Sequence, residues 1–431
     1  MSRLFRLTGF FLLTLWSCCL HAQDRKSVSG RVFDATTKEP VPFAAVSLPT
    51  SLIGTNTNEQ GWFTLSYPAN SSDKRLSINC LGYKVQSLAL DSVNGELMVF
   101  LEHAGFELRE VVVRSLPPTH YISQAMKKLP ENYPDAPFST QAYYRQQVYE
   151  NGDVLGRTEG VFQSYYPHYL DTAKHNQHQL ILYRQADPHE LQFMREKLDK
   201  ERKKGERKAA KKNKDKPQAL DDGITPGGDQ SLVSFGGPEM ILKTDFIRGE
   251  EPFLEEKQFK KFNYSFQGST SYEGRQLMII VFEAKEAVDH FRMNGKIYLD
   301  EESLAIVTIE YSAAIEIPLI AKPIMLLYGF SVDDAYFHKK LQYARIDGRW
   351  YPRDFQWEMQ AHMEKRHLFD PNEQADFKMG QCLFVNQVEL RSPQPILAAS
   401  RFDSKKKMSM QVHPLGNLQW KDINQVAPAA K

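Results

Sequence analysis

The stretch TNTNEQGWFTL, residues 55–65, has the pattern of a strand, a tight turn and a second strand. Gly61 provides the residue that tolerates a positive φ in the turn, and the apolar residues that follow it supply side chains to the surfaces of a small sheet. We therefore predict a hairpin at this stretch. Similar short strands, with glycines at the bends and no helical periodicity, continue across residues 26–102. About seven strands in so short a region predict a Greek-key β-sandwich.

The family resemblance of this region rests on three segments. They are VSGRVFDATTKEPVPFAAVSL, TNTNEQGWFTL and LSINCLGYKVQSL. Together they resemble the carboxypeptidase-like regulatory domain, a transthyretin-like sandwich, over residues 26–102. The resemblance implies a domain typical of secreted and outer-membrane proteins of Bacteroidota-type bacteria, where it precedes many different partner domains. It implies an accessory sandwich only, so peptidase activity does not come with it.

The start of the chain predicts export. Arg3 and Arg6 precede an apolar run of signal-peptide length, and a cleavage site follows Ala22. We expect a signal peptide over residues 1–22 and a location in the periplasm, at the outer membrane or at the cell surface. Lipidation at Cys18 is an alternative use of the same segment. No later apolar run without charges reaches the length of a membrane-spanning helix.

The second predicted domain covers residues 118–395, after a linker at 103–117 and before a C-terminal tail at 396–431. A short amphipathic helix that ends at Pro130 opens it, and strand-rich, aromatic sequence follows. Hairpin turns are expected at Asn151-Gly152, Glu273-Gly274, Glu301–Ser303 and Asp347-Gly348. The fold class is therefore mainly β, with a sandwich followed by a large curved antiparallel sheet or half-barrel.

Parts of this second domain carry a further resemblance. The helix ISQAMKKLPENYP, the AYYRQ strand, GGPEMILKTDF and GKIYLDEESLAIVTIEY together resemble an uncharacterised Bacteroidota domain that follows the same sandwich. The last phrase also resembles the hairpins of Lol-type lipoprotein carriers. The resemblance to these carriers implies a lipid-binding alternative for the function.

The charge of the chain is balanced overall, with one local exception. The 54 basic and 53 acidic residues give a net charge of +1, which provides no general attraction for nucleic acid. Residues 195–216 hold twelve Lys or Arg and five Asp or Glu. We interpret this run as part of a solvated insertion at 190–230, and contact with anionic lipid or lipopolysaccharide as its alternative role.

No motif of catalysis or metal binding stands out. The chain has no HExxH and no GxSxG motif, and no His is followed three positions later by Glu. The weak metal candidates are His168, Asp171, His175 and His178, which would share one face of a helix. Their context is a polar loop between strands, so we predict no metal and no cofactor. Cys80 reads as a buried thiol, and whether it pairs with Cys382 stays open.

These observations favour a non-catalytic, exported cell-envelope protein that binds or assembles a protein, glycan or lipid partner at the outer membrane. A Lol-like lipid carrier and a metal-dependent envelope hydrolase are the alternatives. The candidate lining residues of the binding surface are Tyr143, Tyr144, Phe162, Tyr165, Tyr166, Ile324 and Leu327. The apolar segment 313–330 either plugs the open end of the sheet or contacts a membrane. Nucleic acid is not an expected partner.

Overall fold

The computed structural model describes residues 25–92, 95–104, 115–186, 189, 191–193, 195, 203–204, 207, 233, 236–249, 251–317, 325, 329–367 and 371–425. The predicted signal peptide with Cys18, most of the basic run, and both Ile324 and Leu327 lie outside these residues. So does most of the apolar segment 313–330. Within the described part, no helix is long and apolar enough to cross a membrane.

The N-terminal sandwich has the seven strands that its sequence predicts. They are β1 (Arg25–Asp34), β2 (Ala45–Leu48), β3 (Ile53–Asn56), β4 (Trp62–Pro68), β5 (Arg75–Asn79), β6 (Gln86–Ala89) and β7 (Leu97–Leu101). One layer has the order β4-β1-β7, and the other has the order β3-β2-β5-β6. Alternate apolar side chains, among them Val32, Leu65 and Ile78, are buried in one cluster. Their burial between the layers stabilises a fold made of such short strands.

The stretch at residues 55–65 is an arch between the two layers and not a hairpin, so that prediction was wrong. β3 pairs with β2, whereas β4 pairs with β1 in the other sheet. Buried Thr57 anchors the crossing, because its hydroxyl donates to the Val41 carbonyl at 2.8 Å. Gly61 has a φ of 78°, and a Cβ at this position would lie 2.5 Å from the Val32 carbonyl oxygen. A hairpin and an arch need the same local sequence, so only the pairing partners distinguish them.

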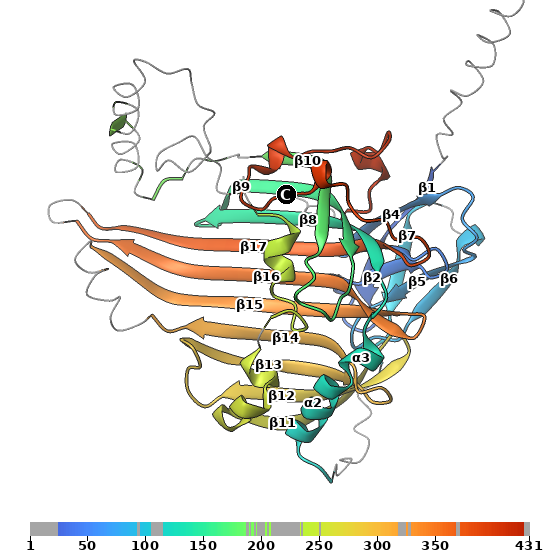
Figure 1. Ribbon diagram of the computed structural model, residues 1–431, viewed down its shortest axis with the longest axis horizontal. Helices are drawn as coiled ribbons and strands as arrows, with labels where there is room; N and C mark the ends of the chain where they lie inside the picture. The colour runs from blue at the N-terminus through green and yellow to red at the C-terminus, as the bar shows by residue number, and fades with distance from the viewer. Residues whose placement is uncertain are drawn as a thin grey trace, which may run out of the picture.

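The predicted large curved antiparallel sheet is confirmed (Figure 1). Its strands are β8 (Phe138–Glu150), β9 (Asp153–Tyr166), β10 (Gln177–Ala186), β11 (Phe262–Tyr272), β12 (Arg275–Ala284), β13 (Phe291–Asp300), β14 (Ile306–Ile315), β15 (Phe330–Ile346), β16 (Arg349–Lys365) and β17 (Glu373–Glu389). Strands β11 to β17 lie side by side in chain order. β8 pairs with the other edge of β17, and β9 and β10 follow it. Each strand in this series is antiparallel to its neighbour, as expected for strands joined by tight turns.

Three of the predicted two-residue hairpin turns occur where the sequence places them. The first turn residues, Asn151, Glu273 and Asp347, have φ values of 51°, 51° and 47°. Each is followed by a glycine that also has a positive φ. Positive φ at both positions is the type I′ geometry, whose twist matches that of the flanking strands. These turns therefore set the register of β8–β9, β11–β12 and β15–β16.

Short helices pack inside the curve of the sheet (Figure 1). α2 (Pro118–Lys127) contacts β11, α3 (Leu129–Asn132) contacts β16, and α5 (Pro238–Leu242) contacts β16 and β17. The opening helix ends at Lys127, and Pro130 lies in the first turn of α3, where a missing N–H is tolerated. After α5, buried Asp245 accepts a hydrogen bond from the Tyr343 hydroxyl at 2.6 Å. Packed side chains thus occupy the inside of the curve at these strands.

The sandwich lies against one end of the large sheet (Figure 1). β3 pairs with β17 at a single position, Ile53 with Gln387, which joins one layer of the sandwich to the sheet. Polar contacts reinforce this junction: the Gly82 amide donates to the Ser271 carbonyl at 3.1 Å. The C-terminal segment also packs here, because the Ser66 amide donates to the Asn424 side chain at 2.6 Å. The two parts of the chain are therefore connected by backbone pairing and by side chains.

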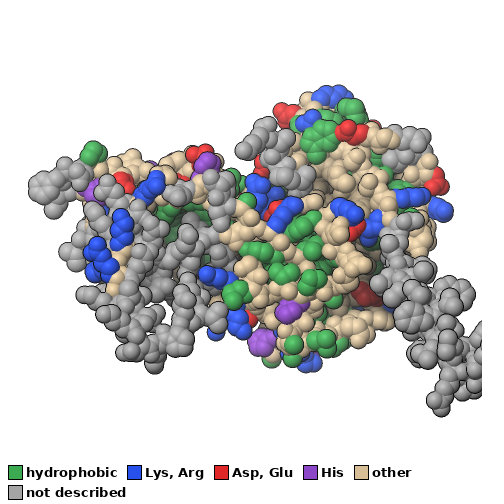
Figure 2. Space-filling view, turned by 90° about the horizontal axis from the view of Figure 1, so that it is seen from above, with side chains coloured by type: hydrophobic (Ala, Val, Ile, Leu, Met, Phe, Trp, Pro, Cys, Tyr) green, Lys and Arg blue, Asp and Glu red, His purple; other side chains and the backbone are tan. Residues whose placement is uncertain are grey.

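The described surface carries no broad field of one charge on the face shown in Figure 2. Hydrophobic side chains lie there in several small groups among polar, basic and acidic ones. This mixture agrees with the balanced composition of the chain.

Candidate binding site at the junction

A cavity of about 610 Å³ lies between the sandwich and the large sheet. Strands β2, β3 and β5 form its wall on the sandwich side, and the β11–β12 turn, the β15–β16 hairpin and β17 form the opposite wall. The volume is within the range of small-molecule binding sites, and junctions between domains are a common place for such sites. We therefore take this cavity as the candidate functional site.

Small polar side chains form the sandwich wall because of strand alternation. Ser47 pairs with both Gly54 and Ser77, and these three residues share the outer face of the layer. Asn56 and Asn79 share the same face one step further along their strands. The residues between them, including Val46 and Ile78, point into the sandwich core. Because the outer residues are small, the face leaves open space where it meets the sheet.

Two β-bulges shape the opposite wall. The ladder between β15 and β16 skips Arg353, which lies between Pro352 and Asp354. The ladder between β17 and β8 skips Asn386. A β-bulge changes the direction in which a side chain leaves its strand. Both bulge residues, Arg353 and Asn386, line the cavity. The β16–β17 ladder itself ends at Asp354 and Phe384, so the strands stop pairing at the level of the cavity.

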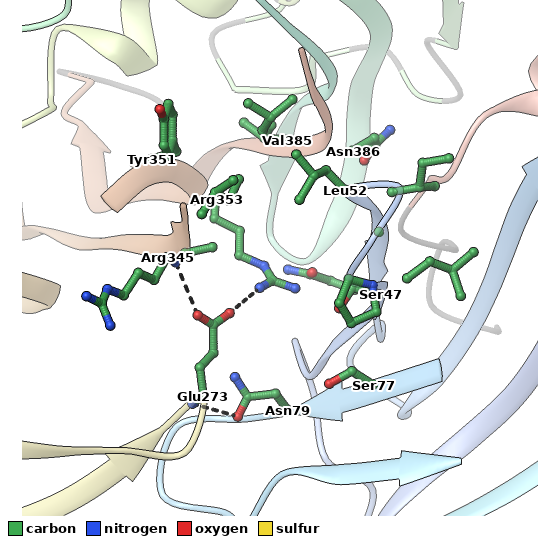
Figure 3. Close-up of a pocket in the computed structure, with 18 of the residues that line it drawn as sticks. Ser47, Leu52, Ser77, Asn79, Glu273, Arg345, Tyr351, Arg353, Val385 and Asn386 are labelled. Atoms are coloured by element: carbon green, nitrogen blue, oxygen red, sulfur yellow. Dashed lines mark hydrogen bonds and ion pairs between the residues drawn. The ribbon is translucent and has the colours of Figure 1, made fainter. Parts of the chain in front are cut away.

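An ion pair crosses the cavity wall (Figure 3). Arg353 donates to the Glu273 carboxylate at 2.8 Å, and the Arg345 amide donates to the other oxygen at 3.2 Å. The two side chains are only 13% and 23% exposed. Burial raises the pKa of the Glu273 carboxyl, and the Arg353 charge opposes that shift. The pair therefore offers adjacent donor and acceptor groups at one wall of the cavity with no net charge.

Asn79 presents an unpartnered donor at the same place. Its Oδ1 accepts from the Glu273 amide at 3.4 Å, while its Nδ2 has no hydrogen-bond partner. Asn79 is only 4% exposed, and in Figure 3 its amide nitrogen points toward the Arg353–Glu273 pair. A buried N–H without a partner is costly, so such a group commonly marks a place where water or a ligand binds.

Asp354 lies behind the cavity and links the two walls. It is fully buried, and the Asn56 side chain of the sandwich donates to it at 3.2 Å. The Gln356 amide donates to both carboxylate oxygens at 3.0 Å. Burial raises the pKa of Asp354 to about 6, against the lowering effect of the Lys340 charge. The folded protein therefore binds a proton at this carboxyl more tightly than the unfolded chain does.

The aromatic residues predicted from the sequence lie elsewhere, on β8 and β9. Tyr143, Tyr144, Phe162 and Tyr166 are buried, with at most 1% exposure, and Tyr165 is half-buried. Their contacts are with protein side chains; for example, the Tyr144 hydroxyl donates to Gln146 at 2.8 Å. None of the five lines the junction cavity. In the described structure they are packing residues of the sheet, and a ligand contact for them stays a prediction.

The weak metal candidates do not converge. His168 accepts a hydrogen bond from the Asp171 amide at 3.1 Å, His175 is exposed, and His178 is buried against Ser164 at 2.8 Å. Burial lowers the pKa of His178 to about 4, which keeps its ring neutral. Among the residues that the structure describes, no group of three or more His, Cys, Asp or Glu side chains could hold a metal ion. Cys80 and Cys382 are both free thiols.

A second cavity of about 780 Å³ lies along the sandwich near β1 and β4. Its lining includes the exposed residues Lys26, Ser27 and Lys74. Its buried carboxylate, Asp73, already accepts from the amides of Thr50 and Ser51 at 2.7 and 2.9 Å. This carboxylate is satisfied within the protein, whereas the junction cavity has an unpartnered buried donor in its wall, so we take the junction cavity as the stronger candidate.

The comparisons with known proteins identify the N-terminal part. Residues 28–113 match the model of the CarboxypepD_reg-like domain. The chain carries a CarboxypepD_reg-like domain. The resemblance stated for residues 26–102 is thereby confirmed, and the strands β1 to β7 are the structure of this domain. It is a non-catalytic domain, so the match assigns no reaction to the protein.

Two solved structures are remote neighbours of the chain. A DUF1329 family protein from Desulfovibrio piger is 10% identical over 65% of this chain and 95% of that chain, with a TM-score of 0.24. A protein of unknown function from Bacteroides fragilis is 10% identical over 85% and 99% of the two chains, with a TM-score of 0.13. Similarity at this level supports no functional conclusion. No curated protein matches the chain.

Sequence reasoning missed the residues that form the cavity. Asn79 was visible as a polar position in the alternating strand RLSIN, but such a residue usually faces solvent. Arg353 and Asn386 gave no signal, because a β-bulge depends on the partner strand. Pro352, inside the strand-forming sequence RWYPRDF, was the one local hint of an interrupted ladder.

Proposed function

We propose that this protein is a non-catalytic, exported cell-envelope protein that binds part of a protein, glycan or lipid partner in the junction cavity. The observation that carries the proposal is the buried, unpartnered Nδ2 of Asn79, a residue in the wall of a cavity of about 610 Å³ that is lined by both polar and apolar side chains. A buried donor without a partner is costly, so we expect water or a ligand to satisfy it.

The domain arrangement supports a binding role. A CarboxypepD_reg-like domain is non-catalytic, and here its outer face supplies one whole wall of the cavity. The other wall comes from the bulged end of the large sheet. A site built from both parts would make ligand binding strengthen their association, since a ligand that bridges two surfaces favours the state in which they are together. This coupling suits an assembly module.

The lipid-carrier alternative would need room for acyl chains inside the curve of the sheet. Ile122, Ile241 and Phe253 are fully buried there as members of the main core cluster. The hydrolase alternative would need a cluster of catalytic groups, and Glu273, paired with Arg353, is the one carboxylate among the described residues that line the cavity. The cavity therefore favours binding over either alternative.

Blocking the cavity tests the proposal. Ser77→Phe places a large ring on the cavity face of β5, and Ser265→Phe, on an exposed position of β11, is the matched control. The full chain would be titrated with carbohydrate, peptide and lipid fractions of a bacterial envelope, with thermal unfolding as the readout. At least one fraction should stabilise the wild type and the control but not Ser77→Phe. Equal stabilisation of all three proteins, or of none, would contradict the proposal.

A further inference from the structure

We infer that the ligand of the junction cavity is a neutral sugar unit, held through its hydroxyl or acetamido groups by Asn79 and the Arg353–Glu273 pair. This inference rests on the proposed function and names the chemical class of its ligand. Three features of the cavity carry it: the charge balance of its walls, the interruption of the neighbouring strand ladders, and the mixture of polar and apolar groups that face the space.

Two of the three arginines that line the cavity, Arg275 and Arg353, are paired with carboxylates within the protein. Arg353 is bound to Glu273 at 2.8 Å, and Arg275 makes two bonds to Asp300 at 2.6 and 2.7 Å. The third, Arg345, points away from Arg353 in Figure 3, and its Nε donates to the Gly348 carbonyl at 3.4 Å. A charged ligand placed against Asn79 and the Arg353–Glu273 pair would lose its hydration without gaining an unpaired opposite charge there. A neutral ligand avoids that cost.

The remaining polar groups suit hydroxyls. Asn79 offers a buried N–H donor, and the ion pair offers a guanidinium donor beside a carboxylate acceptor. Ser47 and Ser77 add hydroxyls from the opposite side (Figure 3). Neighbouring hydroxyls of a sugar ring both donate and accept, so one ring can satisfy adjacent groups of both kinds. An acyl chain in this space would leave Asn79 unsatisfied, which disfavours lipid tails.

Apolar side chains complete the site. Leu52 and Val385 line the cavity above the ion pair in Figure 3, and Val85 lines it from the sandwich. A sugar ring presents C–H groups on its faces and hydroxyls around its edge. A site with apolar groups on one side and convergent polar groups on the other matches that distribution.

An extended peptide fits this place less well. Peptides that bind beside a sheet commonly add as a further strand, which requires a regular ladder of donors and acceptors on the free edge. Here the β16 edge contains Pro352, which has no N–H, and the bulge at Arg353. The β17 edge contains the bulge at Asn386. Both edges that border the cavity are therefore interrupted.

The test is a titration of the full chain with probes that differ by one property. The neutral probes are D-glucose, D-galactose, D-mannose and N-acetyl-D-glucosamine; D-glucuronate adds a charge, and glycylglycine represents a peptide. Binding would be measured by saturation-transfer NMR and calorimetry. Asn79→Asp keeps the acceptor for the Glu273 amide but replaces the free N–H by an oxygen. Asn263→Asp, at an exposed position of β11, controls for the added charge.

At least one neutral sugar should bind the wild type and Asn263→Asp equally, and Asn79→Asp should weaken it by about tenfold or more. Ser77→Phe, which fills the cavity, should abolish the binding and covers the case in which Asn79→Asp does not fold. Binding of glucuronate or glycylglycine without any neutral sugar would overturn the ligand class while leaving the proposed binding function intact. Failure of every neutral sugar to bind, or binding unaffected by both cavity variants, would overturn the inference itself.

Discussion

Asp354→Asn should remove a pH dependence of stability that the wild-type protein shows in mildly acidic solution. Asp354 is fully buried, and its carboxyl has a pKa of about 6 in the folded protein, against an ordinary value of 3.8. Burial is the main cause, and the Lys340 charge and the Gln356 hydrogen bonds offset part of it. At 1.36 kcal/mol per pKa unit, the difference corresponds to about 3 kcal/mol of free energy of unfolding.

The sign follows from proton binding. Because its pKa is raised, the folded chain binds this proton more tightly than the unfolded chain does. The cost of burying the ionised carboxylate is therefore absent below about pH 4, grows up to about pH 6 and stays constant above it. Wild-type stability should fall by up to about 3 kcal/mol across this window through Asp354 alone. Asp354→Asn lacks that contribution, so the variant should gain stability relative to the wild type as the pH rises.

Urea unfolding at a series of pH values measures the effect, with the fluorescence of Trp350 and Trp357 on the same strand as the signal. The prediction concerns the slope with pH. If the variant loses the hydrogen bond from Asn56, its free energy of unfolding should change by the same amount at every pH. The difference in slope with pH between the variant and the wild type would then stay the same. Asp153→Asn, at an exposed strand end, is the control and should follow the wild type. Parallel curves for Asp354→Asn and wild type between about pH 4 and pH 6 would refute the reasoning.

Two further predictions concern the sandwich and the thiols. Gly61→Ala should destabilise the protein by about 1–3 kcal/mol in thermal unfolding, because a Cβ at its positive φ would lie 2.5 Å from the Val32 carbonyl oxygen. Gly95→Ala has a similar φ of 79° with nothing within 4 Å, so an equal loss there would contradict the steric explanation. Cys80 is only partly buried, contrary to the expectation of a buried thiol, whereas Cys382 is buried and burial raises its pKa to about 11. Iodoacetamide at neutral pH should therefore label Cys382 only after unfolding and Cys80 more readily in the folded protein. A disulfide-linked peptide pair in mass spectrometry would argue against two free thiols.

Local sequence predicted the hairpins well because their geometry is local. Asn151-Gly152 and Asp347-Gly348 adopt positive φ at both positions, as Asn, Asp and Gly do at low cost. The arch at residues 55–65 was mistaken for a hairpin because the same strand–turn–strand pattern serves both. The aromatic residues predicted to line the binding surface do not line the cavity, because a local sequence pattern does not determine which tertiary contacts a residue makes. The pattern around Tyr143 and Tyr166 indicates a buried strand, but it does not indicate which part of the protein packs against these side chains.

The sequence by itself determined the mainly β fold, the sandwich with its family resemblance, and the tight turns, since these depend on residues close together in the chain. Only the tertiary structure decided where the cavity lies. Asn79 meets Glu273 across 194 residues, and Asn56 meets Asp354 across 298. The bulges that aim Arg353 and Asn386 exist only relative to partner strands. The cavity forms where the outer face of the sandwich meets the end of the large sheet. Its shape depends on both surfaces together, so the sequence of either part alone does not predict it.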